Sequence, residues 1–272
     1  MLKKPIKQYS EYMLIRYDLP HKKPGIQLFT TTRQGGVSED NYASFNVSPF
    51  CGDCPEHVKH NLQRLSEKIS ISPEKILIPY QTHGTEIRKI DAGFMQSDSK
   101  EQAELLHGID ALVTNIPEVC IGVTTADCVP VFLYDTIRQV VAVAHAGWRG
   151  TCAKIVSKTI HLMLCEYNCK PEDIQAVIGP SISVQAYQVG EELYTAFQEA
   201  GFPVDQIFVR KDTGLYLDLW KANELLLLSE GIVSNRIAIA GRCTYTEYEL
   251  FFSARRLGIK SGRMFNGIYI HS

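Results

Sequence analysis

A cysteine and a histidine flank a predicted β-hairpin, where they could share a metal ion or a proton. Two apolar segments, Val129 to Tyr134 and Val140 to Ala146, are separated by five residues, a spacing typical of an antiparallel hairpin and too short for a parallel crossover. With the turn centred on Ile137, Cys128 faces the far end of the second segment, next to His145. Opposed Cβ atoms in an antiparallel pair lie roughly 5 Å apart, so a thiolate and an imidazole there can hold one metal ion or exchange one proton.

A third metal ligand is expected, because a catalytic zinc ion usually keeps three protein ligands and leaves one position for water or substrate. His83, in the segment Gln81-Thr82-His83-Gly84, follows the predicted strand Ile76 to Tyr80. A side chain at a strand end beside a tight turn is well placed to enter a cleft. A single histidine there is more typical of an ordinary hydrogen-bonded residue, so the prediction of a metal site depends on His83, Cys128 and His145 together.

A glycine-punctuated turn follows His145 and could bind an anion. The segment Ala146-Gly147-Trp148-Arg149-Gly150-Thr151 joins a strand to a helix, and such turns point backbone N–H groups at an anion. Arg149 adds a bidentate donor for phosphate or carboxylate. A plain structural turn is the alternative interpretation.

Asp127 precedes Cys128 and is the candidate proton carrier of this site. A reaction that uses a metal-activated water needs a carboxylate or a comparable group to move protons. An aspartate in this position is equally typical of a residue that caps a turn. The candidate catalytic residues are therefore Cys128, Asp127 and His145, with the role of Asp127 left open.

The remaining cysteines and histidines have simpler explanations. A run with a three-residue spacing resembles a zinc cluster, but the helix expected from Pro55 turns its members to different faces; these residues are Cys51, Cys54, His57 and His60. Positions typical of small buried thiols are Cys120, Cys152, Cys165 and Cys169, whereas Cys243 stays open. The histidines expected to be solvated are His21, His107, His161 and His271.

The elements that must position these residues indicate a mixed α and β chain. The sequence has no Pro, Gly or Ser-rich linker, low-complexity tract or internal repeat, so we expect one domain over residues 1–272. The expected strands are Gly25 to Thr32, Ile76 to Tyr80, Ala111 to Val113, Val119 to Thr124, Val129 to Tyr134, Val140 to Ala146, Ile174 to Ile178 and Ile237 to Ala240. The expected helices are Pro55 to Ile69, Thr151 to Tyr167, Gly190 to Ala200 and Leu217 to Glu230.

Composition excludes several classes of protein. The chain has 28 Lys and Arg against 30 Asp and Glu, a net charge of −2, which argues against a strongly basic nucleic-acid binder. Its apolar runs are far shorter than the roughly 18 to 20 residues of a membrane span. A chain of this size needs no disulfides, and Met1 to Ser10 carries no secretory pattern, so we expect a reduced, cytoplasmic protein without nucleic-acid or membrane partners.

Motifs distributed over nearly the whole chain resemble one family, variously described as multicopper polyphenol oxidase or laccase-like, peptidoglycan editing factor and bacterial purine nucleoside phosphorylase. The motifs that carry the resemblance are Thr31-Thr32-Arg33-Gln34-Gly35-Gly36-Val37-Ser38, Gln81-Thr82-His83-Gly84, Thr125-Ala126-Asp127-Cys128-Val129-Pro130, His145-Ala146-Gly147-Trp148-Arg149-Gly150, Ile178-Gly179-Pro180-Ser181-Ile182-Ser183, Gly241-Arg242-Cys243-Thr244 and Phe251-Phe252-Ser253 followed by Arg255-Arg256.

The resemblance implies an α+β fold of mixed β-sheets layered with helices, α/β/β/α-like, in a single domain. It implies a metal site with the ligands His83, Cys128 and His145, for which we favour zinc over copper. The implied reaction is phosphorolysis of adenosine, inosine and S-methyl-5'-thioadenosine to the free base and (methylthio)ribose 1-phosphate, with adenosine deamination beside it. The substrate and phosphate contacts expected on this basis are Arg33, Asn46, Arg149, Ser181 and Arg242. The oligomeric state stays open, with a homodimer as the candidate.

Two positions depart from the family pattern. Phe50-Cys51-Gly52-Asp53 stands where the family often has His before Val-Gly-Asp, and Tyr245 to Glu247 lacks a second cysteine often found there.

Three other functions stay open besides the one that the resemblance implies. One is a metal-free hydrolase with Cys128 as nucleophile and His145 as base; another is a copper oxidase of phenols, although a multicopper centre needs more histidines; the third is a non-enzymatic factor in cell-wall assembly.

Overall fold

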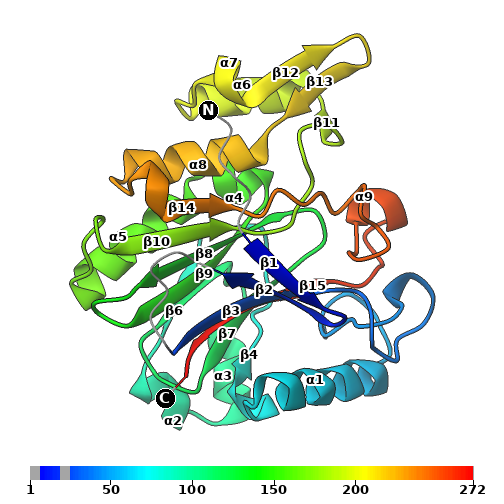
Figure 1. The fold of residues 1–272 in the computed structure, drawn as a ribbon, viewed down its shortest axis with the longest axis vertical. Coiled ribbons are helices and arrows are strands. Elements are labelled where there is room, and N and C mark those ends of the chain that lie inside the picture. Colours follow the sequence, from blue (N-terminus) through cyan, green and yellow to red (C-terminus); the bar gives the residue numbers. More distant parts are fainter. Residues whose placement is uncertain (1–6, 19–24, 272) are drawn as a thin grey trace.

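Two large β-sheets lie face to face, with helices on both outer faces (Figure 1). The structure, a computed structural model, describes residues 7–18 and 25–271. The first sheet has six strands in the order β1 (Lys7–Glu11), β2 (Leu14–Asp18), β3 (Ile26–Thr31), β15 (Met264–Ile270), β7 (Cys120–Thr125) and β4 (Ile76–Leu77). The second has six in the order β14 (Ile237–Ile239), β10 (Ile174–Ile178), β8 (Val129–Asp135), β9 (Val140–Ala146), β6 (Ala111–Thr114) and β5 (Ile87–Ile90).

A small third sheet and the helices surround these two sheets. The third sheet has the order β11 (Gln188–Val189), β13 (Gly214–Leu217) and β12 (Phe208–Lys211). The helices are α1 (Pro55–Ile69), α2 (Ala92–Gln96), α3 (Ser99–Leu105), α4 (Trp148–Cys152), α5 (Ile155–Tyr167), α6 (Glu191–Glu199), α7 (Val204–Ile207), α8 (Leu219–Ser229) and α9 (Ala254–Leu257).

The central strand β8 is apolar on both faces and therefore joins two hydrophobic cores. Successive side chains of a strand point to opposite faces. Phe132 and Tyr134 pack in the core between the two sheets, whereas Val131 and Leu133 pack in the core under α5 and α8. A third core lies between the first sheet and α1. The layers are thus helix, sheet, sheet and helix, which confirms the predicted α+β fold.

Helix α1 has the bounds that the sequence predicts. Pro55 occupies its first position, where the missing N–H costs no hydrogen bond. Leu65 and Ile69 pack against the aromatic residues of β3 and β15. The helix stops at Ser70, whose φ of 57° is left-handed and ends the helical run.

The hairpin of β8 and β9 forms as predicted, but its register differs by one residue. Val129 pairs with Ala146 and Asp135 pairs with Val140, so the turn is centred between Ile137 and Arg138. The cause is Asp135, whose carboxylate accepts hydrogen bonds from the N–H groups of Ile137 and Arg138 at 2.7 and 2.8 Å and thereby fixes a four-residue turn.

Two other predicted elements are corrected by the structure. The single helix Thr151 to Tyr167 is wrong, because the structure has two helices, α4 and α5, separated at Lys154, whose left-handed φ of 61° interrupts the helix. The strand Ile76 to Tyr80 is shorter, since β4 ends at Leu77. Tyr80 instead forms an isolated bridge with His107.

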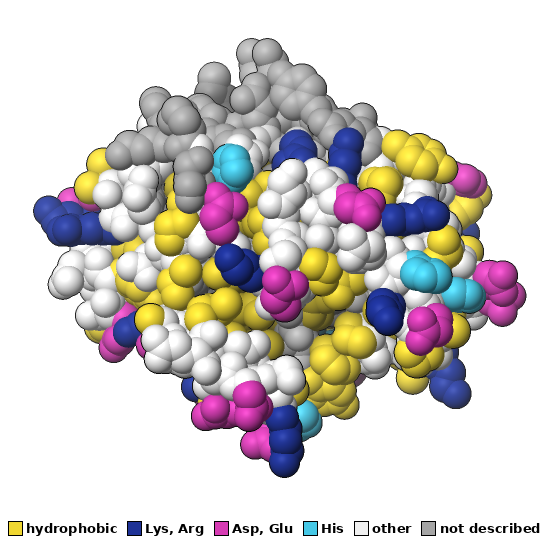
Figure 2. Space-filling view, turned by 90° about the horizontal axis from the view of Figure 1, so that it is seen from below, with side chains coloured by type: hydrophobic (Ala, Val, Ile, Leu, Met, Phe, Trp, Pro, Cys, Tyr) yellow, Lys and Arg dark blue, Asp and Glu magenta, His cyan; other side chains and the backbone are white. Residues whose placement is uncertain are grey.

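On the face shown in Figure 2, the side chains of Lys and Arg are interspersed with those of Asp and Glu, which accords with the net charge of −2. Within the part of the chain that the structure describes, no helix has the length and apolar character to cross a membrane. His21, which we expect to be solvated, lies outside the described residues.

Candidate metal centre

Three separate chain segments bring His83, Cys128 and His145 together. Cys128 lies between β7 and β8, His145 is the penultimate residue of β9, and His83 follows β4. One ligand atom from each side chain can be chosen so that all lie within 4.8 Å of one another. The rings of His83 and His145 meet edge to face, with centroids 4.8 Å apart. The predicted convergence of these three residues is therefore present in the structure.

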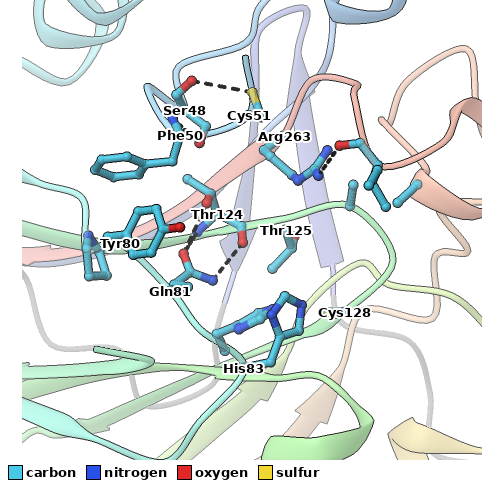
Figure 3. Close-up of a pocket in the computed structure, with 15 residues that line it drawn as sticks. Ser48, Phe50, Cys51, Tyr80, Gln81, His83, Thr124, Thr125, Cys128 and Arg263 are labelled. Atoms are coloured by element: carbon cyan, nitrogen blue, oxygen red, sulfur yellow. Dashed lines mark hydrogen bonds between the residues drawn. The ribbon is translucent and has the colours of Figure 1, made fainter. Parts of the chain in front are cut away.

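The three side chains open into a cavity of about 320 Å³ (Figure 3). Its lining comprises Ser48, Phe50, Cys51, Pro79, Tyr80, Gln81, His83, Thr124, Thr125, Ala126, Cys128, His145, Ala254, Ile259 and Arg263. Gln81 joins the wall of the cavity to β7, because its side-chain amide donates to the carbonyl of Thr124 and accepts from the N–H of that residue. The site is thus a hollow with a polar floor that can receive a small molecule.

Burial differs across the three side chains. His145 is only 3% exposed, Cys128 is half-buried and His83 is exposed. Gly147 allows the backbone after β9 to pass close to Cys128, because a Cβ at this position would lie 2.9 Å from the Cys128 sulfur. The glycine of the predicted turn is therefore required for packing against the thiol.

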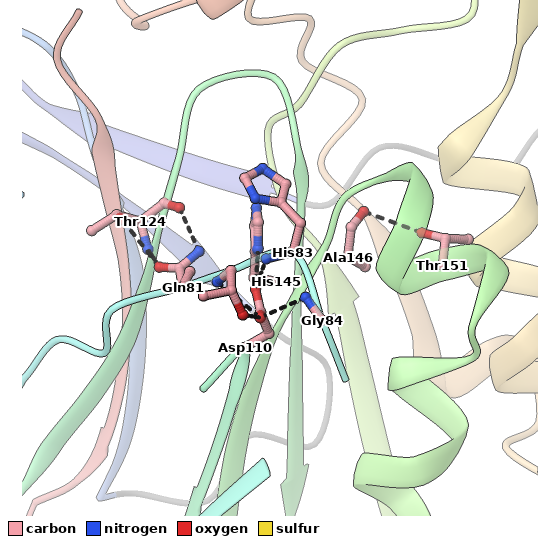
Figure 4. A network of polar contacts seen from close by, with 9 residues as sticks. Gln81, His83, Gly84, Asp110, Thr124, His145, Ala146 and Thr151 are labelled. Carbon is pink, nitrogen blue, oxygen red and sulfur yellow. Dashed lines mark hydrogen bonds and ion pairs between the residues drawn. The ribbon is translucent and has the colours of Figure 1, made fainter. Parts of the chain in front are cut away.

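A buried carboxylate that the sequence did not single out, that of Asp110, orients two of these residues (Figure 4). Its Oδ1 accepts hydrogen bonds from His145 Nδ1 at 2.8 Å and from the His83 N–H at 3.1 Å. Its Oδ2 accepts from the N–H groups of Thr82 and Gly84 at 3.1 and 2.7 Å. This carboxylate fixes the ring of His145 with Nε2 free for a ligand, an arrangement typical of metal-binding histidines.

Cys128 and His145 form an ion pair when no metal is bound. Burial disfavours the thiolate, but the charge and hydrogen bonds of His145, followed by those of His83, outweigh it and lower the pKa of Cys128 to about 6. Burial likewise disfavours the imidazolium, but Cys128 and Asp110 raise the pKa of His145 to about 9. Between these values the metal-free pair is thiolate and imidazolium.

Alkylation of the metal-free protein tests this ion pair. The thiolate is the reactive species, so the rate at which iodoacetamide modifies Cys128 is expected to rise as the pH increases through about 6. Peptide mapping by mass spectrometry measures the rate, with Cys165, exposed on α5, as the internal comparison. A midpoint near the ordinary thiol value of roughly 8.5 contradicts the ion pair.

Asp127 is held by several donors in the structure. It is 8% exposed and has a left-handed φ of 85°. One carboxylate oxygen accepts from Thr244 Oγ1 at 2.7 Å, and the other accepts from Ser253 Oγ at 3.0 Å and the Arg255 N–H at 2.7 Å. These contacts favour the turn-capping role over proton transfer; the catalytic role stays a prediction.

Four of the predicted substrate contacts, Arg33, Arg242, Asn46 and Ser181, are not part of the cavity lining. Arg33 donates to the carbonyls of Ala43 and Tyr248, and Arg242 pairs with Glu247. The other two, Asn46 and Ser181, are fully buried and hydrogen-bonded. Their contacts are those of residues that stabilise loops, and their contact with substrate stays a prediction.

Arg149, the remaining predicted contact, is exposed and stacks on the Trp148 ring at 4.4 Å. It lies inside the short helix α4, which begins at Trp148 directly after Gly147, three residues before the expected helix start at Thr151. Neither Arg149 nor the helix start is part of the cavity lining. Phosphate binding by Arg149 therefore stays a prediction.

The cysteine and histidine run near α1 does not converge on one point. Within residues 7–18 and 25–271, His83, Cys128 and His145 form the one group of three or more His, Cys, Asp or Glu side chains arranged to hold an ion. Cys51 contacts Asn46 instead and lines the cavity. Cys243 is buried and accepts a hydrogen bond from the Ser183 N–H.

The three remaining predicted surface histidines have partners. His107 stacks on Tyr80 with ring centroids 4.8 Å apart. His161 pairs with Glu230, and His271 pairs with Glu118. All three lie outside the cavity lining, as expected from their polar surroundings.

This fold and this His, Cys and His site define a family. The family described as multi-copper polyphenol oxidoreductase laccase matches residues 27–271, and the chain belongs to it. The resemblance seen in the sequence motifs is thereby confirmed.

The similar proteins include enzymes of nucleoside metabolism. A purine nucleoside phosphorylase of Bacteroides thetaiotaomicron is 47% identical over 260 residues, which cover 95% of this chain and 96% of that protein. Adenosine deaminase RL5, from an unknown prokaryotic organism, is 38% identical over 94% of this chain and 98% of its own length. The crystal structure of YlmD from Geobacillus stearothermophilus superimposes with a TM-score of 0.91 and 31% identity, covering 99% of this chain and 100% of that one.

The donor set fits a transition-metal ion. One thiolate and two imidazoles, with ligand atoms within 4.8 Å of one another, match the three protein ligands of a catalytic zinc site. Sulfur and imidazole ligands also suit copper. The opening of the cavity at His83 and Cys128 leaves room for a fourth, non-protein ligand.

Proposed function

We propose that this protein is a zinc-dependent purine nucleoside phosphorylase. Its substrates are adenosine, inosine and S-methyl-5'-thioadenosine, which react with inorganic phosphate to give the free base and (methylthio)ribose 1-phosphate, with adenosine deamination as an accompanying activity. The observation that carries this proposal is the group His83, Cys128 and His145 in a cavity of about 320 Å³. Relatives named purine nucleoside phosphorylase and adenosine deaminase support it.

An apolar wall at the mouth of the cavity suits a purine base. Phe50 and Tyr80 are 48% and 40% exposed, although large apolar side chains favour burial. The rings of Phe50 and Tyr80 meet edge to face at 5.2 Å, and His107 stacks behind Tyr80. A flat heteroaromatic base that packs on this wall covers apolar surface now open to water.

The polar side of the cavity suits the sugar and the reacting bond. His83, Cys128 and His145 hold the ion, and a bound zinc ion supplies Lewis acidity. Asp110 keeps the His145 ring in one orientation, and Cys128 provides negative charge beside a sugar that becomes cation-like as its bond to the base breaks. Binding the base on the apolar wall orients the substrate before the bond breaks.

Product analysis with and without phosphate tests the proposal. Protein with a measured metal content is incubated with adenosine, inosine and S-methyl-5'-thioadenosine, and the products are identified by chromatography and mass spectrometry. Phosphate-dependent formation of ribose 1-phosphate is the expected result. Products that form equally well without phosphate, or no products, contradict phosphorolysis.

A metal-free hydrolase is the second candidate, because the thiolate and imidazolium of Cys128 and His145 also describe an activated nucleophile and its acid–base partner. The two candidates differ in their response to chelation. Removal of the metal abolishes activity if zinc is required and leaves it unchanged if Cys128 is the nucleophile.

A further inference from the structure

We propose that Arg263 binds the phosphate co-substrate inside the cavity that contains His83, Cys128 and His145. This assignment rests on the proposed phosphorolysis and adds a residue to which the motifs gave no role. It replaces Arg33 and Arg242, which do not line this cavity; the Arg242 guanidinium also pairs with the carboxylate of Glu247.

The charges that line the cavity favour an anion. Arg263 is the one Lys or Arg among the lining residues, all of which belong to the described part of the chain, and the same lining includes no Asp or Glu. A low-dielectric cavity strengthens the attraction between a guanidinium and an anion that enters it. Phosphate therefore meets one positive group here and no carboxylate among the lining side chains.

Neutral oxygens hold the Arg263 guanidinium in place. Its Nη1 donates to the carbonyls of Ser261 and Gly262 at 2.6 and 3.0 Å and to Ser261 Oγ at 3.2 Å, and its Nη2 donates to the carbonyl of Ile259 at 2.8 Å. These bonds fix the planar group without neutralising it. The backbone N–H of Arg263 also donates to Asn46 at 3.0 Å, so the residue is anchored at both ends.

Arg263 has no carboxylate within 4.0 Å among the described residues. By contrast, Arg210 and Arg242 pair with Glu191 and Glu247. The charge of Arg263 is therefore available, and a fixed guanidinium that needs no rearrangement is well suited to the planar recognition of phosphate.

The position of Arg263 fits the chemistry. In Figure 3, Arg263 lies across the cavity from Phe50 and Tyr80, with His83 and Cys128 below them. A nucleoside whose base packs on the apolar wall then has its ribose between the base and Arg263. An oxygen of hydrogenphosphate forms the bond to C1′, the bond from C1′ to the purine nitrogen breaks with its electron pair on the purine, and the proton of hydrogenphosphate ends on that nitrogen.

A second hollow, lined by Trp148, Tyr187 and Arg255 among others, is a weaker candidate for phosphate. Its lining includes the carboxylate of Glu192, which repels an anion, and Arg255 donates to the carbonyl of Gln188. None of the three residues that could hold an ion lines that hollow.

Paired variants test the assignment by separating the two substrates. Arg263→Gln is expected to raise the KM for phosphate about 10- to 100-fold, the loss typical of a charge-assisted hydrogen bond, and to leave adenosine deamination within about twofold. Phe50→Ala is expected to raise the KM for the nucleoside and leave the KM for phosphate unchanged. Arg263→Lys, which keeps the charge, restores part of the affinity for phosphate.

Two further measurements identify the cause of any loss. Lys260→Gln removes an exposed charge from the same loop and is expected to leave the KM for phosphate unchanged. Thermal melting shows whether Arg263→Gln disturbs the loop. If both KM values rise while deamination and stability fall, or if the KM for phosphate does not change, the assignment of Arg263 to phosphate is wrong.

Direct binding separates this inference from the proposed reaction. Equilibrium dialysis with radiolabelled inorganic phosphate is expected to show binding to the wild type that Arg263→Gln weakens by the same factor, with adenosine 5'-monophosphate as a competitor to test a nucleotide phosphate as the occupant. Phosphate binding at Arg263 without phosphorolysis overturns the proposed function alone. Absence of phosphate binding, or stronger binding of the nucleotide at Arg263 than of inorganic phosphate, overturns the inference.

Discussion

Replacing Cys128 with alanine is expected to remove the bound metal and to lower phosphorolysis by about a thousandfold or more. The thiolate is one of only three donors in the described site, and two imidazoles alone hold zinc weakly. A metal ion supplies several kcal/mol of transition-state stabilisation, and each 1.36 kcal/mol corresponds to a tenfold change in rate. Atomic emission spectroscopy measures the metal per chain, and initial rates measure the activity.

Cys165→Ala is the matched control, because Cys165 is an exposed thiol on α5 and is not part of the cavity lining. It is expected to keep both metal and activity. A Cys128→Ala protein that retains its metal and turns over at the wild-type rate would falsify the metal centre. If the protein acts only as a scaffold in cell-wall assembly, Cys128→Ala preserves the cellular phenotype despite the loss of metal.

Replacing Asp110 with asparagine is expected to weaken metal binding about 10- to 100-fold, the usual effect of removing the partner of a metal-binding histidine. The Asp110 carboxylate accepts five hydrogen bonds, from His145, from three successive backbone N–H groups and from the Thr82 hydroxyl. An asparagine presents an NH₂ group to some of these donors, so we also expect a loss of about 1–3 kcal/mol in the free energy of unfolding. Metal titration and chemical denaturation measure the two effects.

Asp98→Asn provides the comparison for Asp110→Asn. Asp98 also accepts backbone N–H groups, those of Lys100 and Glu101 at the start of α3, but it lies outside the cavity lining. Because asparagine is an equally good N-cap, its replacement is expected to cost only the charge–dipole interaction, about 0.3–1 kcal/mol, and to leave metal affinity unchanged. Equal effects of the two variants on metal affinity contradict a positioning role for Asp110.

The pH dependence of Asp110 has a defined sign. Burial favours the neutral acid, but the hydrogen bond and charge of His145, with the backbone N–H groups, outweigh it and lower the pKa of Asp110. A carboxylate whose pKa is lower in the folded state stabilises the fold above its ordinary pKa. That stabilisation is lost as the pH falls through the folded-state value.

The strands at the centre of the second sheet could be predicted from the sequence, whereas a central strand of the first sheet could not. β8 and β9 are buried on both faces and read as continuous apolar runs. β15 is interrupted by Asn266 and Gly267. Asn266 is buried because it bonds to Thr30 and Thr125, and Gly267 avoids a clash with Phe29. Those reasons exist only after distant strands have paired.

The convergence of the three proposed metal ligands could be predicted, whereas the residues around them could not. Cys128 and His145 belong to one hairpin, so their proximity follows from local geometry. Asp110 contacts His145 across 35 positions of sequence, and its one local signal is a carboxylate inside the apolar segment Ile109-Asp110-Ala111. Arg263 is held at the cavity by hydrogen bonds within its own loop, such as the one to the carbonyl of Ile259. No motif or periodicity in the sequence distinguishes it from other arginines.

The Asp110 contacts also bear on the order in which the mature protein is assembled. In small zinc domains the ion itself gathers the ligands, so folding waits for metal. Here a buried carboxylate ties the backbone next to His83 to the ring of His145, and Cys128 is placed by the central hairpin. The polypeptide can therefore reach its final form first and acquire the ion afterwards, from the solvent side, where His83 is exposed. An ion bound at the proposed site is then an exchangeable component, whose identity depends on the supply of metals as well as on the chain.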